Sequence, residues 1–511
     1  MTLSRRNFLR WGALTTAITA TGCRVVGRQM ARDQLPTELI VPTPQASVSG
    51  QQTANATINI SPDPIRCLLN RAGYGPRPGD IDVVSNLGFA EYLEQQLHPE
   101  EIDDTAADLT VANLALYHMD LSQLVEQEPR DAAIELGWST VARRIFSQRQ
   151  LYEAMVEFWS DHFHIYLRKN PRMPLLKIVD DRDVIRPHAL GSFRDLLLAS
   201  LHSPAMLIYL DNTRNSREEP NENYGRELLE LHTVGIDAGY TQEDVQAVAR
   251  ILTGLGVGLR GANKGKLLFR QRQHDQGTKT VMGQVFPANG GEDEIVALAD
   301  FLASHPSTAH FIATKMVRRF VADDPPAVLV DQVAQTFLET DGDIKSLLRV
   351  IFLSDQFATA PPKLKRPLTY FISAVRALHG DTRYSGPLLQ HLRLLGQIPF
   401  MWPAPNGYPD VAAAWVNNLL PRWNFALDYT AGDIRGVSFP YEDILTAGGV
   451  TTTVEALDLF ADLLLPHSLD PAARTELLAY IGDGDPFQHD VVTKTREVIA
   501  LLLASPSFQW I

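Results

Sequence analysis

The chain has 511 residues, of which 45% are hydrophobic, so it is long and apolar enough to build a packed interior. Its formal net charge of -14 makes nucleic acid and anionic lipid unfavourable partners. Only two cysteines are present, Cys23 and Cys67, which excludes a disulfide framework.

The first 22 residues predict a twin-arginine export signal. The run from Ser4 to Arg10 contains the pair Arg5-Arg6, and a weakly apolar stretch follows from Trp11 to Gly22. That stretch is too short and too rich in threonine for a permanent membrane helix, which needs about 20 apolar residues. Residues 1–22 are therefore excluded from the fold, and the protein is expected on the periplasmic or extracellular face. Removing them takes away three arginines and no acid, so the formal charge moves from -14 to -17.

The signal ends in Ala20-Thr21-Gly22-Cys23, which resembles a lipobox. In that interpretation Cys23 becomes the lipidated first residue of the mature chain and tethers the protein to a membrane surface. The alternative is ordinary cleavage near Gly22, with Cys23 incidental. If Cys23 carries lipid, Cys67 has no cysteine partner and is most simply a small core residue.

Residues 23–61 predict a lipidated, disordered tether, because they are rich in Thr, Gln, Ser, Ala and Asn and show no sustained period. From residue 62 onward, helical patterns follow one another with short breaks. No alternation of strands and helices and no repeat is visible, so residues 62–511 predict a large all-α domain. A second lobe from about Lys363 is the alternative organisation. The predicted helices are Ile65–Arg71, Ala90–Gln96, Asp131–Phe146, Glu153–Ile165, Phe193–Leu201, Val328–Phe337, Ile344–Phe352, Pro367–Leu378, Pro387–Leu395, Thr453–Leu465, Pro471–Ile481 and Val491–Leu503.

The helix predicted over Glu153–Ile165 carries candidate ligands. Glu157, Asp161 and His164 recur at i, i+4 and i+7, and a carboxylate one turn from an imidazole can orient a proton or hold a metal. Asp161 and His162 are the candidate metal ligands. For His162 the competing interpretation is a core histidine, because apolar residues flank it in helical projection.

Residues 221–254 predict two helices joined by a polar turn. In the first, Tyr224, Leu228 and Leu231 form an apolar stripe, and the second begins at Thr241 as N-cap. Candidate catalytic residues on the first helix are Glu227 as general base, Arg226 for charge stabilisation, and His232. The competing interpretation is a solvated helix face on which Arg226 pairs with Glu230.

Residues 267–286 depart from the helical pattern and predict a small β-hairpin insertion. Its turn contains His274 and Asp275, which complete the set of candidate catalytic residues. Further along, residues 395–426 are dense in Trp402, Tyr408, Trp415 and Trp423. Such residues can platform a sugar ring, or they can wedge a helix pair together.

Several of these segments resemble a large bacterial family catalogued as domain of unknown function 1800. The resemblance implies membership over nearly all of the chain from about residue 62, but no settled activity. Members resemble components of paired systems that include a sulfatase-like family of unknown function numbered 1501, so such a protein is the expected partner. The segments that carry the resemblance are LLNRAGYGPRPGDI, FWSDHF, YLDN, RELLELHTVGIDAGYTQEDVQAVARILTG, HDQGTKTVMG and HPSTAHFIATKMVRRFV.

Two functional hypotheses from different classes follow. The first is an extracytoplasmic hydrolase that uses acid–base or metal-assisted chemistry, with a divalent metal as cofactor, on an extracytoplasmic polymer. The second is a non-catalytic surface lipoprotein that docks a partner such as the sulfatase-like protein. No HExxH, GxSxG, Walker or GxGxxG motif occurs, which disfavours zincin, serine-hydrolase, nucleotide and dinucleotide sites.

Overall fold

The structure is a computed structural model that describes residues 63–258 and 261–511. The predicted export signal, the lipidation site at Cys23 and the tether lie outside the described residues. Within the described part, helices dominate and three two-stranded antiparallel sheets complete the fold. The prediction of an all-α protein with a small β insertion is thereby confirmed. None of the described helices combines the length and the apolarity needed to cross a bilayer.

The helices begin where the sequence supplies caps or prolines. Thr241 forms a capping box with Asp244 at the start of α15 (Gln242–Ile251), as predicted, and the Asp343 side chain caps α19 (Ile344–Phe352). Proline occupies the first turn of α3 (Pro64–Arg71) and α21 (Pro367–Ala377), where its missing N–H costs no hydrogen bond. Local sequence therefore determines where many elements start.

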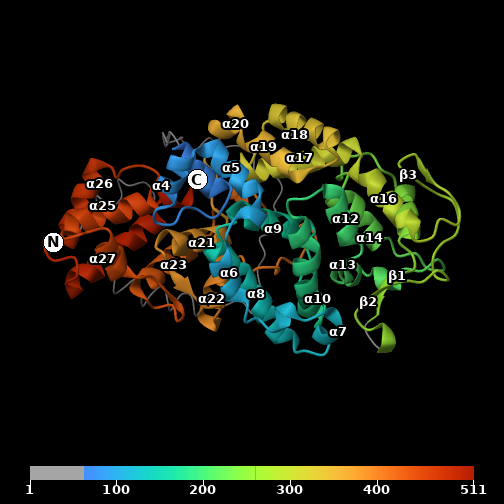
Figure 1. The fold of residues 1–511 in the computed structure, drawn as a ribbon, viewed down its shortest axis with the longest axis horizontal. Coiled ribbons are helices and arrows are strands. Elements are labelled where there is room, and N and C mark those ends of the chain that lie inside the picture. Colours follow the sequence, from blue (N-terminus) through green and yellow to red (C-terminus); the bar gives the residue numbers. More distant parts are fainter. Residues whose placement is uncertain (1–62, 259–260) are drawn as a thin grey trace.

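The first half of the chain builds the middle and one end of an elongated molecule (Figure 1). The elements before the sheets are α4 (Asp80–Leu87), α5 (Phe89–Leu97), η2 (Pro99–Glu101), α6 (Thr105–Val111), η3 (Leu116–His118), α7 (Leu121–Leu124), α8 (Pro129–Phe146), α9 (Gln150–His162), α10 (Met173–Val179), η4 (Asp180–Ile185), α11 (Arg186–His188), α12 (Phe193–Leu201), α13 (Pro204–Tyr209), η5 (Asn212–Arg214), α14 (Glu222–Glu227) and η6 (Leu228–His232).

The sheets and the helices after them follow. Next in the chain are β1 (Leu255–Gly258), η7 (Gly261–Asn263), β2 (Lys266–Phe269), β3 (Lys279–Val281), β4 (Gln284–Phe286), α16 (Asp293–Ala303), α17 (Pro306–Phe320), α18 (Ala327–Glu339) and α20 (Asp355–Ala358). The opposite end contains β5 (Asp381–Thr382), α22 (Gly386–Leu395), η8 (Ala412–Ala414), α23 (Leu419–Ala431), β6 (Val437–Ser438), α24 (Tyr441–Ala447), α25 (Thr453–Leu464), α26 (Pro471–Ile481), α27 (His489–Ala504) and α28 (Pro506–Gln509).

The hairpin predicted over residues 267–286 is wrong in its pairing. Strand β2 pairs with β1, which precedes it in the chain, and β3 pairs with β4, which follows it. The two strands that flank His274, β2 and β3, therefore do not pair with each other. The periodicity identified extended segments but could not choose their partners, because pairing depends on contacts outside the segment.

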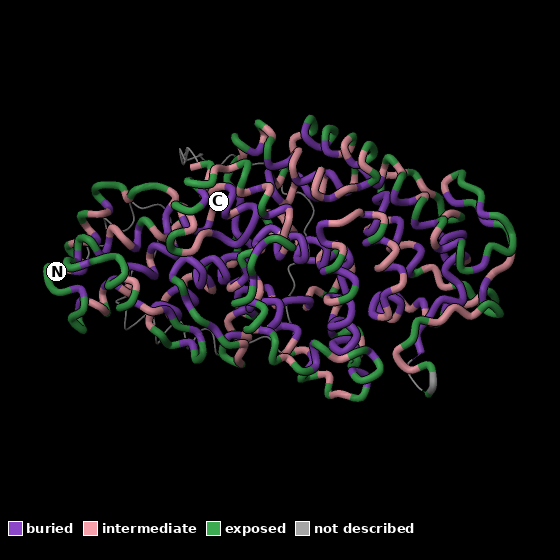
Figure 2. Tube along the Cα trace, viewed as in Figure 1, coloured by how far each residue is buried: buried purple, intermediate pink, exposed green. Residues whose placement is uncertain are grey.

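Two hydrophobic cores lie along the long axis, and buried residues run through both ends of the molecule (Figure 2). The first core draws its residues from 68 to 400. The second draws mainly on residues 368–508, and therefore begins close to the position suggested for a second lobe. Helix α8 belongs to both, since Leu136 packs in the first core and Ile145 in the second. Between the cores, Leu364, Tyr408 and Trp415 form a third, small cluster.

Candidate functional site

The predicted residues His274 and Asp275 lie between the two small sheets. His274 is fully buried, its Nδ1 is 3.0 Å from the carbonyl oxygen of Thr253, and its Nε2 is 3.6 Å from Glu294. The Asp275 carboxylate receives two hydrogen bonds of 2.9 Å from Arg250, which hold its pKa below the usual value. These contacts tie the strands to α15 and α16, and they leave His274 inside the protein rather than at a projecting turn.

Glu227 and Arg226 lie at the end of α14. Arg226 is 3.4 Å from Glu222 and 3.6 Å from Glu230, so the helix-face ion pair expected from the sequence is present. Glu227 is half-buried, and burial together with the nearby Glu230 carboxylate raises its pKa. A raised pKa makes a carboxyl group a stronger base, which favours a role in general acid–base catalysis.

His162 and His232 form a buried pair. The Nε2 of His162 is 3.0 Å from the carbonyl oxygen of His232, and Lys315 donates a hydrogen bond of 2.8 Å to Nδ1 of His162. Burial, and then the Lys315 ammonium group, hold the pKa of His162 well below its usual value and lower that of His232 to about 3. Both imidazoles are therefore neutral. The ring nitrogens of His232 have no hydrogen-bond partner among the described residues.

Asp161 and His162 do not fit a metal site. The Asp161 carboxylate binds Arg366, with Nη1 and Oδ2 2.7 Å apart, whereas His162 is already held by Lys315 and the His232 carbonyl. Successive residues on a helix also point about 100° apart, so the two side chains diverge. Across residues 63–258 and 261–511, no three His, Cys, Asp or Glu side chains are placed to share a metal ion.

The predicted site residues are therefore distributed over separate places. His274 with Asp275, Glu227 with Arg226, and His162 with His232 each have their own surroundings, and Asp161 belongs to a fourth group. The structure does not gather them around one cavity.

The group around Asp161 is a dense ion cluster between the two cores. At its centre lies Glu157 of α9, 3% exposed, which accepts a hydrogen bond of 2.8 Å from the hydroxyl of Tyr74. Arg144, Arg319 and Arg366 approach its carboxylate to 3.2, 3.0 and 2.5 Å. Burial alone would raise the pKa of Glu157, but these guanidinium groups hold that pKa below its usual range.

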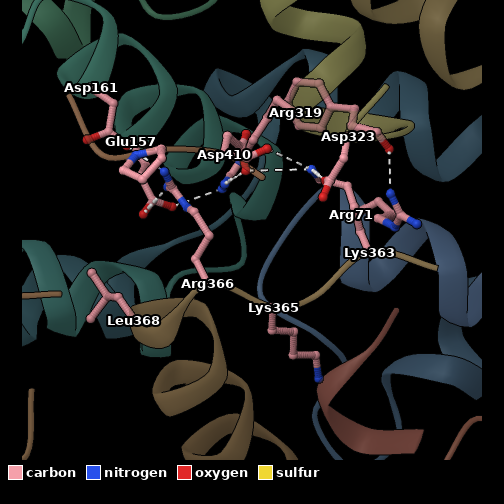
Figure 3. Close-up of polar contacts among 12 residues, drawn as sticks. Arg71, Glu157, Asp161, Arg319, Asp323, Lys363, Lys365, Arg366, Leu368 and Asp410 are labelled. Atoms are coloured by element: carbon pink, nitrogen blue, oxygen red, sulfur yellow. Dashed lines mark hydrogen bonds and ion pairs between the residues drawn. The ribbon is translucent and has the colours of Figure 1, made fainter. Parts of the chain in front are cut away.

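The cluster extends from Glu157 toward the start of α21 (Figure 3). Lys363 contacts Asp323 at 2.5 Å and Asp410 at 3.8 Å, and Arg319 contacts Asp410 at 3.7 Å. Among the described residues no Asp or Glu side chain pairs with Arg71, which donates hydrogen bonds to main-chain oxygens, among them those of Val321 at 2.8 Å and Ile511 at 2.7 Å. We call this set the seam cluster. It comprises the basic residues Arg71, Arg144, Arg319, Lys363 and Arg366 and the acidic residues Glu157, Asp161, Asp323 and Asp410.

A pocket opens beside the seam cluster, with about 340 Å³ of empty space including its mouth. We call it the seam pocket. The buried Nε atoms of Arg71 and Arg366 have no hydrogen-bond partner among the described residues. Arginine and lysine side chains in a pocket lining suit a ligand that supplies oxygen atoms. The charged side chains that line the seam pocket are Arg71, Arg319, Lys363, Lys365, Arg366 and Asp410.

Lys365 lines the seam pocket but differs from the basic residues of the seam cluster. Its Nζ lies 3.8 Å from the centroid of the Phe508 ring, and within the described part of the chain no carboxylate pairs with it. Burial, together with the charge of Arg422, lowers its pKa to about 7. In Figure 3 the Lys365 side chain points away from the cluster around Glu157.

Sequence reasoning singled out Glu157 and Asp161 but missed the basic side of this site. A signal was available, because Lys363, Lys365 and Arg366 form a basic run directly before the proline that starts α21. Arg71, Arg144 and Arg319 come from distant helices, and nothing in their local sequence links them.

The aromatic residues of the segment 395–426 pack beside the seam cluster. Tyr408 and Trp415 are buried with Leu364, and Trp415 donates a hydrogen bond of 3.0 Å to the carbonyl of Pro409. These contacts favour a role in packing between helices over an exposed surface on which a sugar ring could stack.

A family model described as "Protein of unknown function (DUF1800)" matches residues 67–510. No curated protein and no solved structure matches the chain.

Proposed function

Because the chain belongs to the DUF1800 family, whose description states no activity, we propose a function from the geometry: the protein is an envelope protein that binds an anionic ligand in the seam pocket. It does so without chemical conversion, as a docking or carrier protein. The observation that carries the proposal is the lining of this pocket, in which five basic side chains face one acidic one.

The charge balance of the seam cluster supports an anion. Five basic side chains accompany four carboxylates, so the cluster has a formal excess of one positive charge. The chain as a whole has a net charge of -14, so the seam cluster is positively charged within a negatively charged protein. Arginine presents several N–H donors in one plane, which suits a carboxylate, sulfate or phosphate group.

The location belongs to the same proposal. The Arg5-Arg6 signal would direct export by the twin-arginine route, and a lipidated Cys23 would hold the protein at a membrane surface. In that setting the anionic group belongs to a component outside the cytoplasm. A sulfatase-like protein remains the proposed docking partner, and the bound anion is the ligand that the pair would handle.

Calorimetric titration of the purified protein with phosphate, sulfate and acetate tests the proposal. Saturable binding of at least one anion is expected. Lys363→Met should weaken it about tenfold or more, because a charge-assisted hydrogen bond is worth about 1.5–3 kcal/mol. The matched control is Lys345→Met, since Lys345 lies elsewhere and pairs with Glu100. No binding of any of the three anions at millimolar concentration overturns the proposal.

The hydrolase remains a second candidate because of one observation, the raised pKa of Glu227. As general base or acid, Glu227 would act at the surface of α14, with Arg226 stabilising charge at the reacting group. Glu227→Gln should abolish release of fragments from envelope polysaccharide while leaving the melting temperature unchanged. Equal fragment release by wild type and variant excludes this role.

A further inference from the structure

A second, larger pocket adjoins the seam pocket. It contains about 780 Å³ of empty space including its mouth, and we call it the apolar pocket. Both pockets are lined by Asn70, Arg71, Lys365 and Ile511, so they adjoin at these four residues.

The walls of the apolar pocket are mainly hydrocarbon. Leu463 and Leu464 of α25, Phe508 of α28 and Pro362 line it. Polar residues also line it, among them Asn70, Ser507 and Ser373, and the Ser373 hydroxyl donates a hydrogen bond of 2.7 Å to the carbonyl of Tyr74. The interior therefore favours an aliphatic group, whereas the end shared with the seam pocket is cationic.

Lys365 lies at that junction. Its residue is 4% exposed, its Nζ faces the Phe508 ring, and no carboxylate of the described chain pairs with it. The face of an aromatic ring attracts a cation but replaces a counter-ion only partly. A buried ammonium group without a counter-ion is costly, so an anion supplied from outside would be strongly favoured here.

From these observations we infer that the ligand of the seam pocket is an amphipathic anion. Its carboxylate or phosphate head binds Lys365 and Arg71, and its aliphatic chain fills the apolar pocket. This inference rests on the proposed function and adds the chemical class of the ligand. The negative net charge of the protein opposes adsorption to a whole anionic surface, but the local cations decide the binding of a single head group.

Asp63 also lines the apolar pocket, where its carboxylate pairs with Arg66 at 3.7 Å.

Titration with acetate, octanoate, decanoate and dodecanoate, each as monomers, tests the inference. Binding should tighten about fourfold per added methylene until the apolar pocket is full. Lys365→Met should weaken dodecanoate binding about tenfold or more, because it removes the charge and keeps the apolar stem. Leu463→Gln should weaken dodecanoate but not acetate. Leu459→Gln, on the same helix but outside the pocket lining, is the control.

The outcomes separate this inference from the proposed function. If acetate or phosphate binds but chain length has no effect, the amphipathic ligand is wrong and anion binding stands. If no anion binds, both are wrong. If dodecanoate binds equally well to wild type and Lys365→Met, the head-group contact is wrong. A parallel titration with dodecyl phosphate compares a lipid-type phosphate head with the fatty carboxylate, and the tighter ligand identifies the source.

Discussion

Glu157 shows how a single carboxylate can organise a protein interior. It is buried in α9, yet its carboxylate is contacted by Tyr74 and by arginines from three other segments. Each guanidinium group would be costly to bury alone, and each is stabilised by the shared negative charge. The sequence places Glu157 on a polar helix face, but only the fold converts that face into the centre of a cation-rich site.

Replacing Glu157 by Gln tests this role. The variant should lose about 3–5 kcal/mol of unfolding free energy, because it leaves buried guanidinium groups without their counter-ion. Chemical denaturation measures the loss. The control is Glu94→Gln, whose partner Arg349 is at the surface, and which should change the free energy by about 1 kcal/mol or less. Similar losses in the two variants would contradict the central role of Glu157.

Lys365 gives a pH dependence with a definite sign. Its pKa in the folded protein is about 7, compared with 10.5 for an exposed lysine, so between these values the unfolded chain binds more protons than the folded one. The unfolding free energy should therefore rise with pH from about 7 to 10.5, by at most about 1.4 kcal/mol per pH unit. Below pH 7 both states carry the proton and the destabilisation is fully present.

Denaturation of wild type and Lys365→Met at several pH values measures this contribution. Lys315 also has a lowered pKa, of about 8, so the informative quantity is the difference between the two proteins. That difference should shrink as the pH rises from 7 toward 10, because the variant has no ammonium group to lose. A difference independent of pH would show that Lys365 titrates normally.

At the scale of elements, the helix around Glu227 changes its winding. The sequence predicts a stripe of Tyr224, Leu228 and Leu231, but α14 passes into the π-helix η6 at Leu228. The wider turn rotates the following residues, so that Leu229 and His232 are buried and Leu231 is partly exposed. The 3.6-residue period therefore fails at this point. The π-helical turn also explains why the His232 side chain faces the core beside His162 and not the surface beside Glu227.

The loop that carries the aromatic residues rests directly on α9. Gly407 has φ of +71°, and a Cβ atom there would lie 2.1 Å from the carbonyl oxygen of Asp161. Gly407→Ala should therefore displace the loop and destabilise the protein by well over 1 kcal/mol, and it should alter anion binding because Asp410 of this loop pairs with Arg319 and Lys363. Thermal denaturation and the anion titration measure the two effects.

Gly239 supplies the matched control for Gly407. Its φ is +79°, but an added Cβ would meet no atom within 4 Å. Gly239→Ala therefore carries the backbone strain without the collision, and it should cost about 1 kcal/mol and leave anion binding unchanged. Equal effects of the two substitutions would mean that the loop is not held against α9.

At the scale of the whole molecule, the two cores are expected to unfold together. Helix α8 contributes to both, and the seam cluster joins α9 and α17 on one side to the start of α21 on the other. Separating the cores would expose these buried charges without their partners, which adds to the cost of exposing apolar surface.

One substitution in each core tests this coupling. Phe193→Ala in the first core and Phe425→Ala in the second should each remove about 3–5 kcal/mol, since both side chains are fully buried. Differential scanning calorimetry should show a single transition that moves to lower temperature in both variants. Two separate transitions, of which only one moves in each variant, would mean that the cores are independent.

Many elements of this fold were predictable because their causes are local. Helices α12 and α19 follow from apolar periodicity and from their caps, α26 follows from the Asp470 cap and Pro471, and the observed bounds of all three match the predicted ones. Helices such as α16, α17 and α23 were not predicted. Strand pairing and the π-helical turn at Leu228 were not predictable, because both depend on what lies across from the segment rather than within it.

The sequence by itself determined the fold class, the family and the boundaries of helices such as α12, α19 and α26. Only the tertiary structure decided which polar residues meet. It separated His274, Glu227 and Asp161, and it brought Arg71, Arg319 and Arg366 together from distant parts of the chain. The physical reason is that helix formation depends on neighbours within about one turn, whereas a charged site depends on which buried groups can neutralise one another across the packed cores.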